Sequence, residues 1–88
     1  MIVKSRKKFF SDLGKIKSLD LIDHVEYIYL LAAGCRHAED IPGFKWLTGY
    51  SSYGRIKIAD YRIGVHIAGN AITFICFIHR SVIYEKFP

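Results

Sequence analysis

Two neighbouring segments of the chain carry polar side chains that could handle a phosphodiester at every second position. Arg55 and Lys57 alternate with isoleucines. Arg62 and His66 alternate with apolar residues in the segment that follows. Successive side chains of a β-strand point to opposite faces, so the members of each pair share a face. If the apolar sides meet the core, these side chains gather on the open face of a sheet. There they would bind a phosphate backbone, and nearby tyrosines could stack on bases.

Three further reactive side chains stand near the C-terminus, where His79, Arg80 and Tyr84 follow an apolar segment. The predicted open face has no carboxylate cluster that could hold magnesium, so a nuclease built there would be metal-independent. Such a nuclease uses the 2′-hydroxyl of RNA as its nucleophile. The protein supplies a base, cationic stabilisation of the transition state and an acid. We therefore expect RNA, not DNA, as the substrate of such a site, and no cofactor.

Sequence motifs of other chemistries are missing. The chain has no Walker-type glycine loop, no paired-cysteine motif and no nucleophile-elbow serine. Cys35 and His37 could ligate a metal, but no second pair stands at ligand spacing, so we expect no metal site. Cys76 lies in an apolar strand pattern, which is typical of a buried and inert thiol.

The composition is that of a small, basic, globular protein. The 88 residues are 51% hydrophobic and 24% charged, which predicts one domain over residues 1–88. A net charge of +5 favours an anionic partner. The apolar segment 71–78 is too short to span a bilayer. The N-terminus has apolar residues before its basic cluster, the reverse of a secretory signal, so we expect a cytoplasmic protein.

The elements that must position the reactive side chains begin with a helical hairpin. Ile2 and Val3 suggest a short first strand, and residues 6–13 place apolar side chains at helical spacing. Ser18 is a suitable N-cap for a second helix that Gly34 ends. The two helices should pack antiparallel with one apolar side.

After residue 53 the hydrophobic period changes to two, as expected of strands. Gly69-Asn70 is a two-residue hairpin signal, and residues 71–78 are apolar at nearly every position, as in a central strand. The tail, residues 80–87, could form a helical turn or an edge segment. These features predict an α+β fold, with the N-terminal antiparallel helical hairpin packed on one face of a small, mainly antiparallel sheet. No helix is predicted to cover the other face.

Residues 53–64, Y-G-R-I-K-I-A-D-Y-R-I-G, resemble the signature of the RelE/ParE toxin superfamily, which commonly is Y-Y-R-I-R-I-G-D-Y-R-I. The ending F-I-H-R-S-V-I-Y resembles the closing H-R-x-x-x-Y pattern of that superfamily, and residues 7–13 resemble its first helix. The resemblance covers nearly the whole chain. Ala59 replaces the usual glycine, so the turn there either needs no positive φ or tolerates some strain. Ser81-Val82 replaces the charged pair that often follows the H-R.

This resemblance implies the toxin of a type II toxin–antitoxin pair. RelE-like members cleave messenger RNA in the ribosomal A site and leave a 2′,3′-cyclic phosphate. The positions that form the site in those members are matched here by five residues: Arg55, Lys57, Arg62, Arg80 and Tyr84.

The roles of these side chains follow from their chemistry. Lys57 is the candidate base, a role that neighbouring positive charges would favour. Arg62 and Arg80 should grip the scissile phosphate, because the planar fork of arginine suits that task. Arginine is a poor proton donor, so the acid is either His79 or a water held by Arg80.

The remaining side chains would bind the RNA around the cut. Tyr84 could stack on a base or orient the 2′-hydroxyl. Arg55 and His66 are expected to contact the RNA backbone from the sheet. Both His66 and His79 could instead be hydrogen-bonded supports, which is the commoner role of a histidine in or after a strand.

Two other functions stay open from the sequence. The protein could be a ParE-like inhibitor of DNA gyrase, which binds without chemistry, or a plain binding module or inactive toxin. A toxin of either kind implies a cognate antitoxin, acidic and helical with a DNA-binding N-terminus, in a hetero-oligomer. That antitoxin should lie across the sheet or over the helical hairpin.

Overall fold

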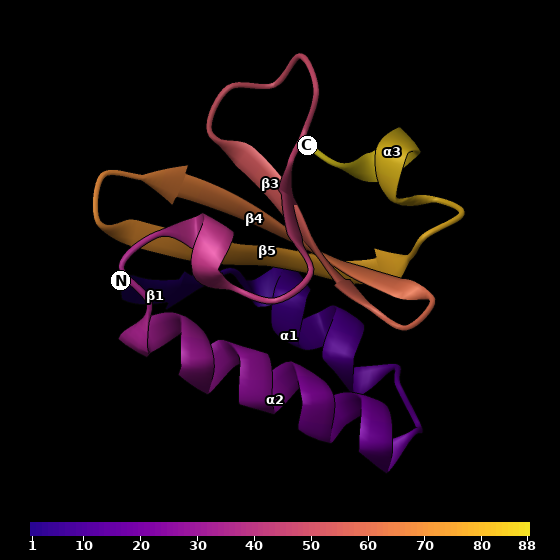
Figure 1. The fold of residues 1–88 in the computed structure, drawn as a ribbon. Helices are drawn as coiled ribbons and strands as arrows, with labels where there is room; N and C mark the ends of the chain where they lie inside the picture. The colour runs from indigo at the N-terminus through magenta and orange to yellow at the C-terminus, as the bar shows by residue number, and fades with distance from the viewer.

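A five-stranded sheet with helices on both sides forms the protein, and the computed structural model describes residues 1–88 throughout (Figure 1). The elements, in chain order, are β1 (Ile2–Ser5), α1 (Lys7–Gly14), α2 (Leu19–Gly34), the 3-10 turn η1 (Ala38–Asp40), β2 (Phe44–Trp46), β3 (Tyr53–Ile58), β4 (Tyr61–Ala68), β5 (Ala71–His79) and α3 (Ile83–Lys86).

The sheet has the strand order β1-β5-β4-β3-β2, in which β1 is parallel to β5 and all other neighbours are antiparallel. Short turns join β3 to β4 and β4 to β5, and Gly69 in the second turn has a φ of +57°. Strand β5 lies inside the sheet, as its apolar sequence predicts. The α+β fold with a mainly antiparallel sheet is thus confirmed.

The helices α1 and α2 lie together on one side of the sheet, as the helical hairpin was predicted to do (Figure 1). The Oγ of Ser18 accepts a hydrogen bond from the Leu21 N–H at 3.2 Å, which caps α2. Helix α2 ends at Gly34. None of the helices is both long and apolar enough to cross a membrane.

The core lies between this hairpin and the sheet. The α2 stripe of Val25, Ile28 and Ala32 packs there with Phe9 of α1. Full burial of a side chain as large as Val25, Ile28 or Phe9 contributes about 1.5–3 kcal/mol to stability. The strands supply the other half of the core through seven side chains: Ile56, Ile58, Ile63, Val65, Ile72, Phe74 and Phe77.

A buried carboxylate fixes α1 to the sheet. Asp12 is only 5% exposed, and its oxygens accept hydrogen bonds from Lys8 Nζ at 2.9 and 3.0 Å. It also accepts the backbone N–H of Phe77 at 3.0 Å. Strand β1 ends its pairing with β5 at Ser5, so the carboxylate supplies the acceptor that a neighbouring strand would otherwise give.

The prediction that no helix covers the second face of the sheet was wrong. Helix α3 lies on the opposite side of the sheet from α1 and α2 (Figure 1). Its Ile83 is fully buried, and Phe87, one helical turn later, packs with it against Cys76. A β-carbon at Gly64 would come within 2.8 Å of the Phe87 ring, so the glycine makes room for that ring.

The turn between β3 and β4 keeps a left-handed residue although it has no glycine. Ala59 has a φ of +52°, which is unfavourable for a residue with a β-carbon. Of the two alternatives for this position, the structure shows that the turn tolerates some strain.

Candidate functional site

Lys57 and Arg62 lie directly opposite each other on β3 and β4. Their chain neighbours Ile56, Ile58 and Ile63 are buried in the core, so both cationic side chains point to the face of the sheet away from α1 and α2. Directly paired residues on adjacent antiparallel strands have β-carbons about 4.5–5.5 Å apart. The predicted pair of cations therefore exists, and we call it the Lys57–Arg62 pair.

Arg62 and Arg80 are both anchored at the turn between β3 and β4. Arg62 Nη1 donates to the backbone oxygens of Ala59 at 3.0 Å and Tyr61 at 2.9 Å. The backbone N–H of Arg80 donates to the Asp60 carbonyl oxygen at 2.8 Å, and its Nε lies 3.8 Å from the Asp60 carboxylate. Both members of that ion pair are well exposed, so it is easily exchanged for another anion.

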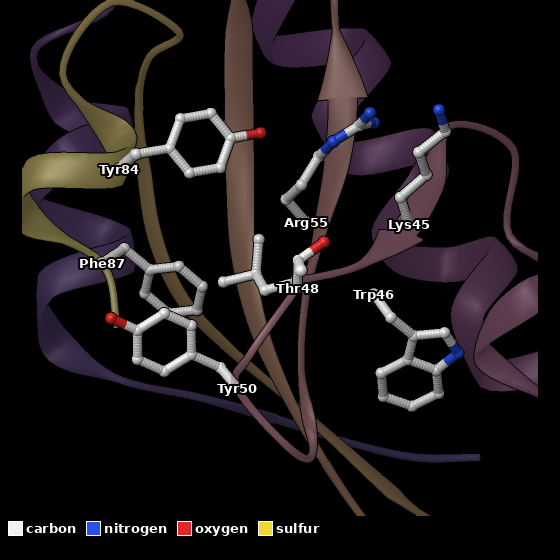
Figure 2. Close-up of a pocket in the computed structure, with 8 residues that line it drawn as sticks. Lys45, Trp46, Thr48, Tyr50, Arg55, Tyr84 and Phe87 are labelled. Carbon is white, nitrogen blue, oxygen red and sulfur yellow. The ribbon is translucent and has the colours of Figure 1, made fainter.

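Arg55 and Tyr84 face each other across a groove of about 450 Å³ on the same side of the sheet. Figure 2 shows the Tyr84 ring reaching from α3 with its hydroxyl directed towards the Arg55 guanidinium. Arg55 Nη1 is anchored by donating to the Gly43 carbonyl oxygen at 2.7 Å. We call this depression the Tyr84 groove.

The Tyr84 groove also contains residues that the sequence analysis did not single out. Lys45 of β2 pairs with Arg55 and adds a second cation to the groove. Tyr50 is 56% exposed and offers an aromatic ring at the groove, whereas the ring of Trp46 packs against that of Phe44 at 5.0 Å (Figure 2). The alternation of Phe44-Lys45-Trp46 was the available signal, but three residues are too few to establish a strand by pattern alone.

His79 lies apart from the Lys57–Arg62 pair. It is paired with Tyr61, whose ring lies 5.4 Å from the His79 ring and stacks on Phe77 on the core side of the sheet. The Ser81 N–H donates to His79 Nδ1 at 3.1 Å, and the Ser81 hydroxyl lies 2.9 Å from the same atom. The ring thus supports the turn after β5, on the opposite face from the two cations.

His66 is on the open face but distant from the Lys57–Arg62 pair. Four residues along β4 separate it from Arg62, which is about 13 Å at the usual strand rise. Its ring lies 4.8 Å from that of Tyr53, and Phe87 over Gly64 lies between the two regions. The structure therefore divides the predicted basic surface into two parts.

The two cysteines are free thiols. Cys76 is 2% exposed beneath the C-terminal tail, and this burial raises the pKa of its thiol above the usual value. The thiol is therefore protonated at neutral pH, in agreement with an inert, structural cysteine.

Comparison with known proteins places this fold among small toxins crystallised with their antitoxins. A chain of the RelB–RelE antitoxin–toxin complex from Methanococcus jannaschii superposes with a TM-score of 0.82 and 27% identity, over 97% of this chain and 99% of that one. A chain of the Escherichia coli DinJ–YafQ complex has the same fold, with a TM-score of 0.63 and 9% identity over 93% of this chain and 96% of that one.

The sequence gives the family directly. It is 31% identical to the toxin RelE3 of Methanocaldococcus jannaschii over 93 aligned positions, which cover the whole of both chains. No protein-family model matches the chain. The protein belongs to the RelE family of toxins of type II toxin–antitoxin systems.

Proposed function

We propose that this toxin is a metal-independent endoribonuclease that cuts messenger RNA in the ribosomal A site. The observation that carries the proposal is the Lys57–Arg62 pair, two cations opposite each other on an open sheet face. Arg80 stands at the same end of the sheet, and the Tyr84 groove adjoins it. Positive charge of this kind suits a reaction in which negative charge grows on a phosphate. The ribosomal substrate places the proposed activity in the cytoplasm.

In the proposed reaction Lys57 acts as the base that removes the proton of the 2′-hydroxyl. The 2′-oxygen attacks the adjacent phosphorus, and the bond to the 5′-oxygen of the next nucleotide breaks. The products are a 2′,3′-cyclic phosphate and a free 5′-hydroxyl. Arg62 and Arg80 stabilise the charge on the non-bridging oxygens of the transition state, because guanidinium groups bind such oxygens in a fixed geometry.

The leaving 5′-oxygen needs a proton. The sequence leaves two acids open, and the placement of His79 against Tyr61 disfavours His79, so the acid is a water held by Arg80. The hydroxide that remains takes up the proton that Lys57 removed, which restores both groups. Arg80 must then exchange the Asp60 carboxylate for the phosphate. An exposed ion pair is worth about 0–1 kcal/mol, so this exchange costs little.

The Tyr84 groove would hold the nucleotides that flank the cut. Two exposed aromatic side chains of the groove, Tyr50 and Tyr84, offer ring faces to bases, and Arg55 and Lys45 offer charge to phosphates. Stacking of one base on an aromatic side chain contributes about 1–3 kcal/mol. This binding role does not require any sequence-specific contact.

Cleavage should depend strongly on Lys57. In a cell-free translation extract, primer extension should reveal new ends within codons when the wild-type toxin is added. Lys57→Met should lower the cleavage rate by roughly 10²–10⁴-fold, the usual contribution of a general base. His79→Gln serves as the matched control on the same sheet and should lower the rate far less.

Two further results bear on the proposal. A messenger RNA with a 2′-deoxy nucleotide at the cut position should resist the wild-type toxin, because it lacks the nucleophile. Uncut transcripts, together with unchanged toxicity of Arg80→Ala, would overturn the proposal. Inhibition of DNA supercoiling by gyrase with intact transcripts would instead establish the ParE-like, non-catalytic function.

We also propose that a cognate antitoxin covers the basic face. The solved relatives are complexes named for an antitoxin and a toxin, RelB–RelE and DinJ–YafQ. With a net charge of +5, this chain should attract an acidic partner. The antitoxin would be helical, with a DNA-binding N-terminus, and would form a hetero-oligomer with the toxin.

A further inference from the structure

A second pocket opens beside Phe87, at the edge of the sheet where β5 has no partner strand beyond Phe74. Its volume is about 200 Å³, and Phe87 is part of the wall of both this pocket and the Tyr84 groove. Arg6 and Lys8 enter it from the start of α1, Lys86 enters from α3, and Tyr53 forms a side. We call it the Arg6–Lys86 pocket.

The charges of this pocket are unbalanced. Three cationic side chains line it and no acidic side chain does, so the only negative group at its wall is the terminal carboxylate of Pro88. Lys8 is neutralised by Asp12, but neither Arg6 nor Lys86 takes part in an ion pair. Two unpaired cations at one pocket repel each other, and a bound anion would relieve that repulsion. The pocket is therefore suited to a phosphate.

The Tyr53 ring at the side of the pocket indicates which class of anion would bind there. The Tyr53 ring is held in place by the rings of His66, at 4.8 Å, and Phe87, at 5.7 Å. Positive charge beside a fixed aromatic ring is the usual combination for single-stranded nucleic acid, in which phosphates alternate with groups that contact ring faces. An acidic peptide would pair with the cations but would gain less binding free energy from contact with the Tyr53 ring.

The position of the pocket agrees with such a ligand. The Lys57–Arg62 pair lies at the turn end of β3 and β4, whereas Tyr53 begins β3 at the opposite end. We propose that the Arg6–Lys86 pocket binds a backbone phosphate of single-stranded RNA, outside the nucleotide that is cut. The RNA strand would then run from the Lys57–Arg62 pair past Phe87 to this pocket. This inference rests on the proposed ribonuclease function.

The test uses RNA binding without cleavage. A fluorescein-labelled hexanucleotide with 2′-O-methyl groups throughout cannot be cut by 2′-hydroxyl attack, and anisotropy gives its affinity for the full-length toxin. Arg6→Gln/Lys86→Gln should bind it roughly tenfold more weakly than wild type. The slope of log affinity against log salt should fall by about 0.7, because one phosphate contact is lost from a single strand.

A charge-matched variant serves as the control. Lys15→Gln/Lys17→Gln removes the same two charges from exposed positions of the α1–α2 connection, outside both depressions. Its affinity for the hexanucleotide should change less than twofold. Circular dichroism should show the same melting temperature for both double variants, because all four side chains are exposed. Equal losses of affinity in the two double variants would overturn the inference.

The outcome separates this inference from the function on which it rests. If wild-type toxin cuts transcripts but the pocket variant binds RNA as well as the control variant does, only the inference fails. If wild-type toxin leaves transcripts intact while the pocket variant loses RNA affinity, only the ribonuclease function fails. If the pocket variant keeps its RNA affinity but loses affinity for the antitoxin, the pocket serves an acidic protein and the inference is wrong.

Discussion

At the scale of single residues, the face on which a side chain lies depends on its position in the alternation of its strand. Lys57 and Arg62 share the open face because β3 and β4 pair without interruption over this region. Strand β5 behaves differently, since its register with β4 shifts so that Ile75 is left unpaired between Phe74 and Cys76. This bulge turns His79 towards the core side.

The bulge also explains why the sequence predicts the face on which Lys57 lies but not the face on which His79 lies. Arg55 to Ile58 alternates between polar and apolar residues, so the sequence itself fixes the face of each side chain. Residues 71–78 are apolar almost without exception, and such a run carries no information on register. The side of the sheet on which His79 lies was therefore beyond prediction, whereas that of Lys57 was not.

Ala59 gives a prediction at this scale. Its left-handed backbone costs an alanine about 1–2 kcal/mol relative to the ordinary conformations, a penalty that glycine does not incur. Ala59→Gly should therefore raise the free energy of unfolding, by about 0.5–1 kcal/mol after the larger entropy of an unfolded glycine is subtracted. Urea denaturation at 25 °C would measure this change.

Ala68→Gly is the control for that measurement. Ala68 ends β4 in an exposed position and does not have a positive φ. The same replacement should lower the free energy of unfolding there, because glycine loses more entropy in a strand. Destabilisation by both replacements would contradict the strain assigned to Ala59.

At the scale of elements, the helical hairpin and the strands β3 to β5 were predictable because each is long enough to repeat its pattern. Strand β2, with three residues, was not predictable, and for the tail that contains the four-residue α3 the sequence left a helical turn and an edge segment open. The structure has the helical turn. The spacing of Ile83 and Phe87 did contain a signal, since residues four apart lie on one side of a helix. A single such pair also occurs by chance. Only the structure shows the surface around Gly64 against which this pair packs.

The packing of α3 can be followed through the Cys76 thiol beneath it. Phe87→Ala should loosen the tail and raise the rate at which Cys76 reacts with a thiol reagent by at least roughly tenfold, because local opening then exposes the sulfur. A Cys35→Ser background leaves Cys76 as the single thiol. The rate is followed by absorbance under conditions in which the protein stays folded.

Tyr84→Ala provides the comparison for the thiol experiment. Tyr84 lies on the same helix but is 66% exposed, so its removal should leave the Cys76 rate within about twofold of the parent. A Phe87→Ala rate no faster than that of the parent would show that the tail does not protect the thiol.

At the scale of the whole molecule, 88 residues with a net charge of +5 form a small core under a repulsive surface. Binding of an acidic antitoxin to the folded toxin alone should stabilise it. At an antitoxin concentration one hundred times the dissociation constant, the gain is about 2.7 kcal/mol. For a domain of this size, that corresponds to a rise in melting temperature of roughly 10 °C or more.

Calorimetry of the isolated toxin and of the complex would measure this rise. The gain should shrink as salt is added, because screening weakens the attraction between exposed charges. A toxin that melts no lower alone than in the complex would contradict the expected dependence on its partner.

Because α3 packs on the sheet separately from the main core, formation of the core and formation of the Tyr84 groove are two different events. Tyr84 stands on a four-residue helix held by the side chains of Ile83 and Phe87, whereas the core is held by two long helices and five strands. A unit this small opens at a lower free energy than the rest of the protein. At any moment some molecules therefore have a complete core and an incomplete groove. A toxin molecule can therefore be folded without a formed Tyr84 groove, and a few C-terminal residues set the balance between these two states.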